Sequence, residues 1–365
     1  MFRIRIGSVA LIIGVATSAW AQPATAPAVD VSVDPRIELM CTIFRLAGNP
    51  EYSRSALKAY SADVATYFEP VHDHELVQFA RRLRSTRSVS YDAPMSLAVH
   101  FADVRSFEGI VPLDPLPEGV DGRWQVEDVR EFQRLAKDFV RQGGFDEFIA
   151  QHQSLYDEST NRLRQMLEKN AHLEWFDKFF GVRPAARFKV VIGLQDGPGN
   201  YGVHVTTSAG EQLYCILGVW QVDANGIPIF SDAEVIPIVV HEFNHSYANP
   251  LIEKNYQQLR AAGDVLFKKS EAQMRSQAYS NGKTVLYESL VRASVVRYRY
   301  ANEGALAASG EVLTQQRRGF VWVGALSAVL DEYERNRETF PTLDSFMPKI
   351  VKFFNEYASS AATRP

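Results

Sequence analysis

The feature that most constrains this chain is the sequence His241-Glu-Phe-Asn-His245, an H-E-x-x-H pattern that follows an apolar run ending at Val240. On a helix, histidines four residues apart lie on one face, where both imidazoles can bind a single metal ion. Glu242 then lies beside that ion, where it can take a proton from a metal-bound water. The apolar neighbours indicate a helix buried in a core, and buried histidines need partners. The alternative is a solvated helical turn that carries two surface histidines.

A catalytic zinc site typically has three protein ligands and one open position, so the sequence must supply a third ligand. No histidine follows His245, which leaves the downstream acids Glu253, Glu271 and Glu288. Glu253 lies beyond Pro250 and is not simply on the same helical face, and Glu271 lies among lysines and arginines in a polar segment. Glu288 stands among apolar residues of a predicted helix, and an acid on a core-facing helix needs a partner.

We therefore expect His241, His245 and Glu288 to bind Zn²⁺, with Glu242 as the catalytic general base. The competing interpretation of Glu288 is an ion pair with Arg292, one helical turn later.

The pair of histidines with Glu288 about forty residues downstream resembles the gluzincin arrangement of metallopeptidases, in which a later helix supplies a glutamate ligand. The chain is also similar, along most of its mature length, to an uncharacterised bacterial family of zincin-like domains. This resemblance implies a zincin-like fold. Many peptidase gluzincins carry an acid four positions after their glutamate ligand, where this chain has Arg292. The segments that carry the family resemblance are Asp34–Leu39, Phe44–Pro50, Tyr91–Ala98, Asn200–Gly202, His241–Pro250 and Tyr287–Ala293.

The hydrophobic periodicity predicts an α+β fold that is mostly helical, with a small antiparallel sheet directly before the helix of the metal motif. That helix begins either at a capping box on Ser231 or at Pro237, and Pro250 predicts its end or a kink. We divide the mature chain into a helical N-terminal region, residues 34–183, and a zincin-like metallohydrolase region, residues 184–365. The three predicted strands are Phe188–Leu194, Tyr201–Thr207 and Gln212–Val219.

The N-terminus has the charge and apolar pattern of a secretory signal peptide, residues 1–21, followed by a flexible leader, residues 22–33. We therefore expect a periplasmic or secreted protein. The apolar run is too short for a comfortable transmembrane helix, so stable membrane insertion is not expected. The net charge of -4 and the absence of a Lys/Arg block argue against a nucleic-acid partner. Cys41 and Cys215 are compatible with one disulfide or with two buried thiols.

These observations predict a secreted zinc-dependent hydrolase, a gluzincin-type metallopeptidase that acts on a peptide or protein through a zinc-bound water activated by Glu242. The alternatives are a catalytically inactive binding module with a zincin fold and a zinc amidase acting on cell-wall material. The sequence leaves the oligomeric state open. An oxyanion could be stabilised by Tyr247, Tyr287, Arg292 or His204.

Two further predictions concern the surroundings of the motif. Asn249 is a candidate partner for a ligand histidine, and the strand edge near Tyr201–Val205 could pair with an extended peptide. His72 and His74, two residues apart, fall on different helical faces and are predicted to lie on the surface.

Overall fold

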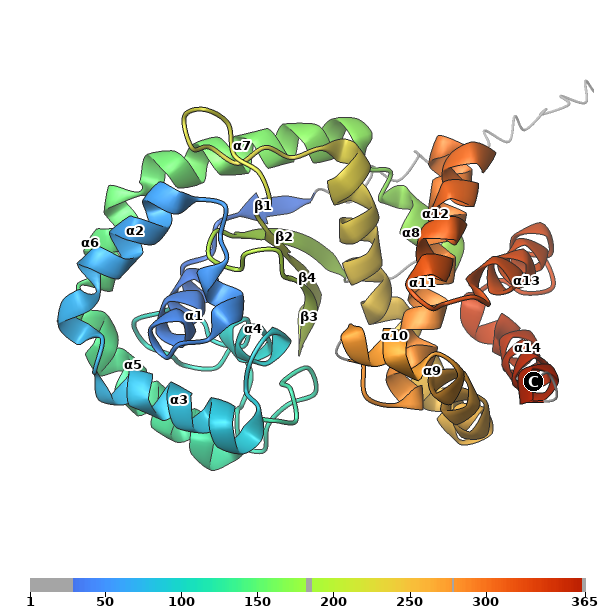
Figure 1. The fold of residues 1–365 in the computed structure, drawn as a ribbon, viewed down its shortest axis with the longest axis horizontal. Helices are drawn as coiled ribbons and strands as arrows, with labels where there is room; N and C mark the ends of the chain where they lie inside the picture. Colours follow the sequence, from blue (N-terminus) through green and yellow to red (C-terminus); the bar gives the residue numbers. More distant parts are fainter. Residues whose placement is uncertain (1–28, 182–185, 278, 363–365) are drawn as a thin grey trace, which may run out of the picture.

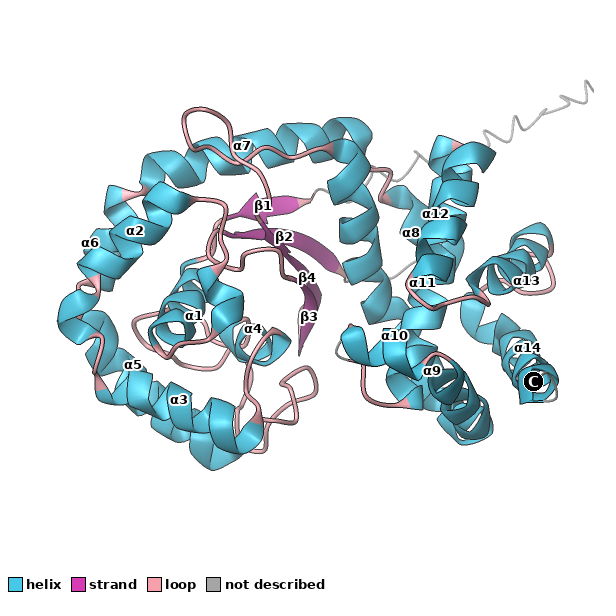
Figure 2. Ribbon diagram, viewed as in Figure 1, coloured by secondary structure: helices cyan, strands magenta, loops and turns pink. Residues whose placement is uncertain are grey.

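The computed structural model describes residues 29–181, 186–277 and 279–362, and these form a mostly helical α+β fold, which confirms the predicted class (Figures 1 and 2). The predicted signal peptide and most of the predicted leader lie outside the described residues. The chain builds two halves that lie side by side, an N-terminal half with the sheet and a C-terminal half of helices (Figure 1). Among the described residues, no helix is both long and apolar enough to cross a membrane.

Helices of the N-terminal half form a ring around two central helices (Figure 1). The central helices are α1 (Pro35–Leu46) and α4 (Asp92–Ala98). Helix α1 begins where the sequence favours it, because Asp34 accepts a hydrogen bond from the Arg36 N–H at 2.9 Å and Pro35 needs no such partner. The surrounding elements are η1 (Pro50–Ser53), α2 (Lys58–Tyr67), η2 (Glu69–Val71), α3 (Glu75–Arg87), α5 (Val126–Gln142), α6 (Phe145–Gln151) and α7 (Gln153–Asn170).

The sheet has four strands in the order β1-β2-β4-β3, and it is mixed rather than antiparallel as predicted. Strands β1 and β2 pair in parallel, β2 and β4 pair in parallel, and only β3 and β4 are antiparallel. Strand β1 lies in the segment predicted as a flexible leader, so its residues belong to the fold. The strands are β1 (Asp30–Ser32), β2 (Arg187–Gly193), β3 (Asn200–Thr207) and β4 (Gly210–Gly218).

The connection from β2 to β3 explains the error in the predicted pairing. Glu38 of α1 accepts hydrogen bonds from the backbone N–H of Leu194, at 2.9 Å, and from the Gln195 side chain, at 3.3 Å. The Cys41 thiol donates to Asp196 at 3.0 Å. These contacts fold residues 194–199 onto α1 and place β3 beyond β4 instead of beside β2. Local turn signals carry no information about such a long-range anchor.

The helix that carries the metal motif is α9 (Asp232–Lys269), and it is much longer than predicted. It begins after Ser231, one of the two starts that the sequence allowed, although the Ser231 side chain makes no capping hydrogen bond. Pro237 and Pro250 both lie inside it, so α9 does not end at Pro250, which was one of the two outcomes that the sequence allowed there. A proline costs an internal helix one hydrogen bond, but α9 is held along its length by contacts with β3, β4, α11 and α14.

Helix α11 (Gly282–Glu303) packs directly against α9. The two backbones meet at Gly263 and Gly282, where a Cβ on Gly282 would lie only 2.4 Å from the Gly263 carbonyl carbon. This close approach brings the inner faces of α9 and α11 together. The remaining helices of the described chain are α8 (Glu174–Phe180), α10 (Glu271–Ser276), α12 (Ala305–Arg317), α13 (Val323–Arg335) and α14 (Leu343–Ala362).

Both cysteines are buried free thiols. Of the two states that the sequence allowed, the structure therefore has the one without a disulfide.

Candidate metal centre

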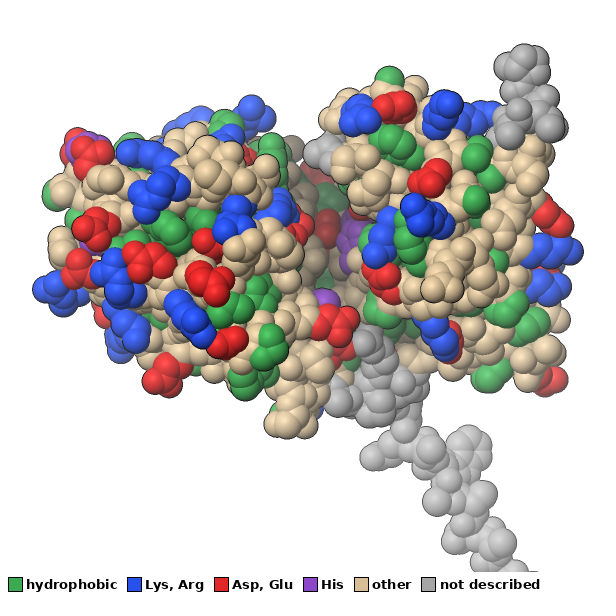
Figure 3. Space-filling view, turned by 90° about the horizontal axis from the view of Figure 1, so that it is seen from below, with side chains coloured by type: hydrophobic (Ala, Val, Ile, Leu, Met, Phe, Trp, Pro, Cys, Tyr) green, Lys and Arg blue, Asp and Glu red, His purple; other side chains and the backbone are tan. Residues whose placement is uncertain are grey.

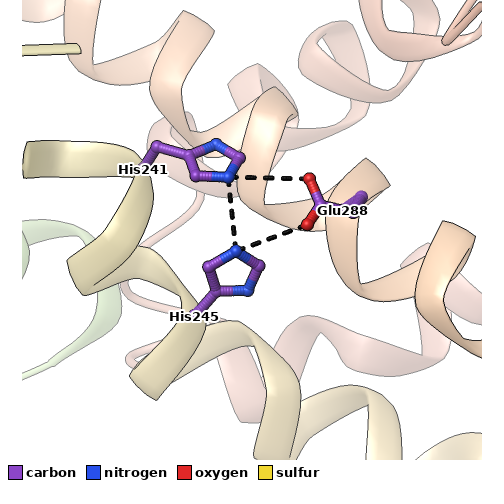
Figure 4. A group of neighbouring side chains, drawn as sticks. All are labelled: His241, His245 and Glu288. Atoms are coloured by element: carbon purple, nitrogen blue, oxygen red, sulfur yellow. Dashed lines mark hydrogen bonds and ion pairs between the residues drawn. The ribbon is translucent and has the colours of Figure 1, made fainter. Parts of the chain in front are cut away.

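Two histidines of α9 and one glutamate of α11 point toward one another (Figure 4). The Nε2 atoms of His241 and His245 are 3.2 Å apart. The Glu288 carboxylate lies 3.5 Å from His241 Nε2 through Oε2 and 3.4 Å from His245 Nε2 through Oε1. One potential ligand atom from each residue falls within 4.8 Å of the others, so the group could hold a metal ion. The structure thus brings together the three residues predicted as ligands.

The protonation states favour metal binding by this group. Burial lowers the pKa of His241 well below its ordinary value, so its imidazole is neutral and has a free lone pair. Burial opposes ionisation of Glu288, but the electrostatic interactions around it, first among them the charge of Arg292, outweigh burial and lower the pKa of Glu288 to about 2. A neutral imidazole and an ionised carboxylate are the forms that bind metals.

Asn249 contacts His245 at Nδ1, the ring nitrogen that does not face Glu288. His245 Nδ1 lies 3.3 Å from Asn249 Oδ1, one helical turn later on α9. When Nδ1–H donates to this oxygen, Nε2 carries the lone pair that faces Glu288. The contact is the one predicted for Asn249, with a histidine that is a candidate ligand.

Glu242 lies next to the group, beneath strand β3. A Cβ on Gly202 of β3 would lie 2.7 Å from the Glu242 carbonyl oxygen and 3.1 Å from Glu242 Oε2, so glycine is the residue that fits. Burial raises the pKa of Glu242 to about 7, a rise opposed by the charge of His245 and by a hydrogen bond from the Gly202 backbone. Strand β3 therefore packs directly against Glu242, the residue that follows His241 on α9.

Arg292 connects Glu288 to a buried polar network. Its Nη2 lies 2.8 Å from Glu288 Oε2 and donates to the Tyr279 hydroxyl at 2.9 Å, while its Nη1 donates to Gln315 Oε1 at 2.6 Å. The guanidinium also lies over the Phe320 ring, 4.6 Å from its centroid. Glu288 is therefore both a candidate ligand and an ion-pair partner, the two roles that the sequence presented as alternatives.

Sequence reasoning missed Tyr279 and Gln315. Tyr279 lies just before the Asn281-Gly282 helix start, where hydrophobic periodicity says nothing about side-chain direction. Gln315 is on α12, and only the tertiary packing of α12 on α11 brings it to Arg292.

Two candidates for stabilising an oxyanion, Tyr247 and His204, do not line the cleft that His241 and Glu242 line. Tyr247 is a core residue stacked on Phe180, with ring centroids 4.6 Å apart. His204 lies beside the Gly119 backbone near His100.

The two rejected acids are paired elsewhere. Glu253 contacts Lys283 and the hydroxyl of Tyr287, and Glu271 accepts from Arg275 at 2.7 Å.

The prediction for the histidine pair at 72 and 74 is half right. His72 is exposed, but the His74 side chain is largely buried and caps α3 by accepting from the Leu76 N–H at 3.1 Å. A histidine in a capping position packs against the turn that it caps, which the helical-face argument did not consider.

A cleft of about 610 Å³ reaches the candidate metal group. Seen from below, histidine and acidic side chains lie in the hollow between the two halves of the molecule (Figure 3). One wall is the first turns of α9 and the other is formed by α11 and α12. The lining residues are Asn200, Trp220, Ala233, Glu234, Pro237, Ile238, His241, Glu242, Tyr279, Arg292, Val295, Arg299, Glu311, Thr314, Gln315 and Arg318.

Fold and site together define a mostly helical α+β protein with a possible His-His-Glu metal group in a cleft. The chain belongs to the family described as Domain of unknown function (DUF4932), whose sequence model matches residues 29–353. No curated protein and no solved structure matches the chain significantly.

Proposed function

We propose that this protein is an exported zinc-dependent hydrolase, and specifically a metallopeptidase. The observation that carries the proposal is the convergence of His241, His245 and Glu288 at a cleft that His241 and Glu242 line. In a tetrahedral zinc site with bonds of about 2.0–2.1 Å, ligand atoms are separated by about 3.3–3.4 Å. The two imidazole nitrogens are 3.2 Å apart, and each lies 3.4–3.5 Å from a different oxygen of Glu288. One ligand atom from each residue lies within 4.8 Å of the other two, a spacing that small side-chain adjustments would bring to the zinc geometry.

Zinc, when bound, lowers the pKa of a coordinated water toward neutrality and polarises a carbonyl group. Glu242, held by Gly202, accepts the proton of the attacking water and later delivers it to the leaving amine. Asn249 keeps the His245 ring in the required orientation. Arg292 keeps Glu288 ionised, and Tyr279 and Gln315 fix the guanidinium in place.

An extended peptide is the substrate that best suits the surroundings of Glu242. Strand β3 is an edge strand of the sheet, and its Asn200 lines the cleft while its Gly202 contacts Glu242. An edge strand offers unpaired backbone groups to a peptide in extended form. The predicted signal peptide supports a reaction in the periplasm or outside the cell.

Metal content and turnover test the proposal separately. We expect residues 22–365 to bind about one zinc per chain, and Glu288→Ala to lose most of it because only two ligands remain. Glu242→Gln should keep the zinc but lose hydrolysis of a mixed peptide library. A folded wild-type protein that binds no zinc would refute the proposal. A zinc-loaded wild type that binds peptides without cleaving them would favour a binding module, and one that cleaves only cell-wall amides would favour an amidase.

A further inference from the structure

The two walls of the cleft differ in charge. The α9 wall presents mostly small or apolar residues before His241, with Glu234 near the start of the helix. The facing wall presents three arginines, which are Arg292 and Arg299 on α11 and Arg318 immediately after α12. Whether these arginines are free to bind a substrate depends on their partners within the protein.

Two of the three arginines are neutralised. Arg292 is paired with Glu288 at 2.8 Å. Arg299 contacts Glu303 at 2.7 Å and Glu311 at 3.1 Å. Both guanidinium groups are therefore structural, and their charges are balanced inside the wall.

Arg318 differs from these two. Its backbone is fixed, since its N–H donates to the Gln315 carbonyl at 3.1 Å and its own carbonyl accepts from Gln277 at 2.8 Å. Its side chain is exposed, and within the described residues no carboxylate lies within 4.0 Å of its guanidinium. Arg318 lines the same cleft as His241 and Glu242. Among the described residues that line this cleft, it is thus an arginine without a carboxylate partner, in the same hollow as the candidate general base.

We propose that Arg318 is the subsite for a carboxylate of the substrate, close to the bond that is cleaved. The inference rests on the proposed function and adds to it a substrate class, peptides with a carboxylate near the scissile bond. A planar guanidinium can donate two parallel hydrogen bonds to a carboxylate, which fixes orientation as well as charge. The whole protein carries a net charge of -4, so its overall field does not attract acidic peptides. A preference for them requires a local cation.

The carboxylate has two possible sources in a peptide, an Asp or Glu side chain or the free C-terminus. Four forms of one hexapeptide library, randomised over residues other than Asp and Glu, distinguish them. The forms carry either Glu or Gln at one fixed position, and either a free or an amidated C-terminus. Each form is fluorescently labelled at its N-terminus.

Binding is measured by fluorescence anisotropy on the zinc-loaded Glu242→Gln protein, so the result does not depend on turnover. We expect the best carboxylate form to bind about tenfold more tightly than the form with neither carboxylate. In Arg318→Gln this ratio should fall to near one. Arg317→Gln is the matched control, because Arg317 is the adjacent exposed arginine, contacts Thr314 at 3.1 Å and does not line the cleft. It makes the same change in net charge and should keep the ratio.

The outcomes separate this inference from the proposed function. A ratio near one in the parent protein, or a ratio that survives Arg318→Gln, overturns the subsite. A ratio that falls equally in Arg317→Gln also overturns it, because the effect is then one of general charge. A preference that depends on Arg318 in a protein whose wild type cleaves no peptide supports the subsite and refutes the peptidase. The source of the carboxylate is identified by the peptide form that loses affinity in Arg318→Gln. Loss for the Glu form indicates a side chain, and loss for the form with a free C-terminus indicates the terminal carboxylate.

Discussion

Replacing Arg292 by Met tests whether the buried charge of Glu288 can be neutralised either by Arg292 or by a metal ion. The Arg292 side chain is 4% exposed and contacts the Glu288 carboxylate at 2.8 Å. Met keeps the bulk of the chain but removes the charge, so Glu288 is left as a buried anion without its cation. Removing one partner of a buried ion pair costs about 3–5 kcal/mol. Some of this cost should disappear when a metal cation takes over the pairing.

The size of the effect follows from the length of the chain. With an unfolding entropy of about 2.1 cal/mol/K per residue, roughly 330 ordered residues give a Tm change of about 1.4 °C per kcal/mol. The metal-free Arg292→Met protein should therefore unfold about 4–7 °C below the wild type. Saturating zinc should return about half of this loss, roughly 2–4 °C, in addition to the stabilisation that zinc gives the wild type.

Thermal unfolding followed by circular dichroism, with EDTA or with excess zinc, measures both quantities. Arg297→Met is the matched control on the same helix. Arg297 is buried and paired with Asp331 at 2.8 Å and with Glu334 at 2.6 Å, and neither acid is among the candidate ligands. The Tm of Arg297→Met should fall, and zinc should raise it by no more than it raises the Tm of the wild type. Zinc could instead raise the Tm of Arg292→Met by no more than it raises the Tm of the wild type or the control. That result would refute the idea that a metal ion replaces Arg292 as the cationic partner of Glu288.

Three further predictions concern the surroundings of the site and the buried acids. Gly202→Ala should keep its zinc but lose about tenfold or more of any hydrolysis, because the new Cβ displaces Glu242; turnover and metal content measured on one sample check this. Asn249→Ala should weaken zinc binding by about 10- to 100-fold, as shown by competition with a chelator of known affinity, and an unchanged affinity would mean that the contact with His245 is incidental. Burial and the neighbouring charge of Glu38 raise the pKa of Asp196 to about 7, although a hydrogen bond from Cys41 opposes the rise. Between about pH 4 and pH 7 the folded protein therefore keeps a proton on Asp196 that the unfolded chain has already released. Stability should accordingly fall as the pH rises from about 4 to 7, and Asp196→Asn should make that slope smaller by about 1.4 kcal/mol per pH unit in urea titrations; an unchanged slope would contradict the raised pKa.

The candidate ligands could be predicted because local and chemical rules agree at those positions. The four-residue spacing of His241 and His245 is a property of any helix, and a solitary acid among apolar residues, Glu288, is costly unless it is paired. Most of the helices could be predicted from hydrophobic periodicity, because that pattern is also a local property of the sequence. Where the sequence failed, a distant contact decided the result. Pro250 did not end α9 because packing against α11 and α14 holds the helix, and the β2–β3 connection was redirected by Glu38 of α1.

The two interpretations of Glu288 that the sequence left open are not exclusive. A carboxylate has two oxygens with about four lone-pair positions, and Glu288 presents both oxygens to the histidines while Oε2 also faces Arg292. Many of the peptidase gluzincins that the chain resembles carry an acid four positions after their glutamate ligand, whereas this chain carries the cation Arg292 there. Arg292 has two opposite effects on metal affinity: it keeps Glu288 ionised, and it also competes with a metal for the same carboxylate. A bound metal cation would keep Glu288 ionised by itself, so the competition is the effect that remains, and Arg292 stabilises the metal-free protein at the expense of metal affinity. Arg292→Met should bind zinc more tightly than the wild type although it is less stable, and an isothermal titration that finds weaker binding would refute this account of the site.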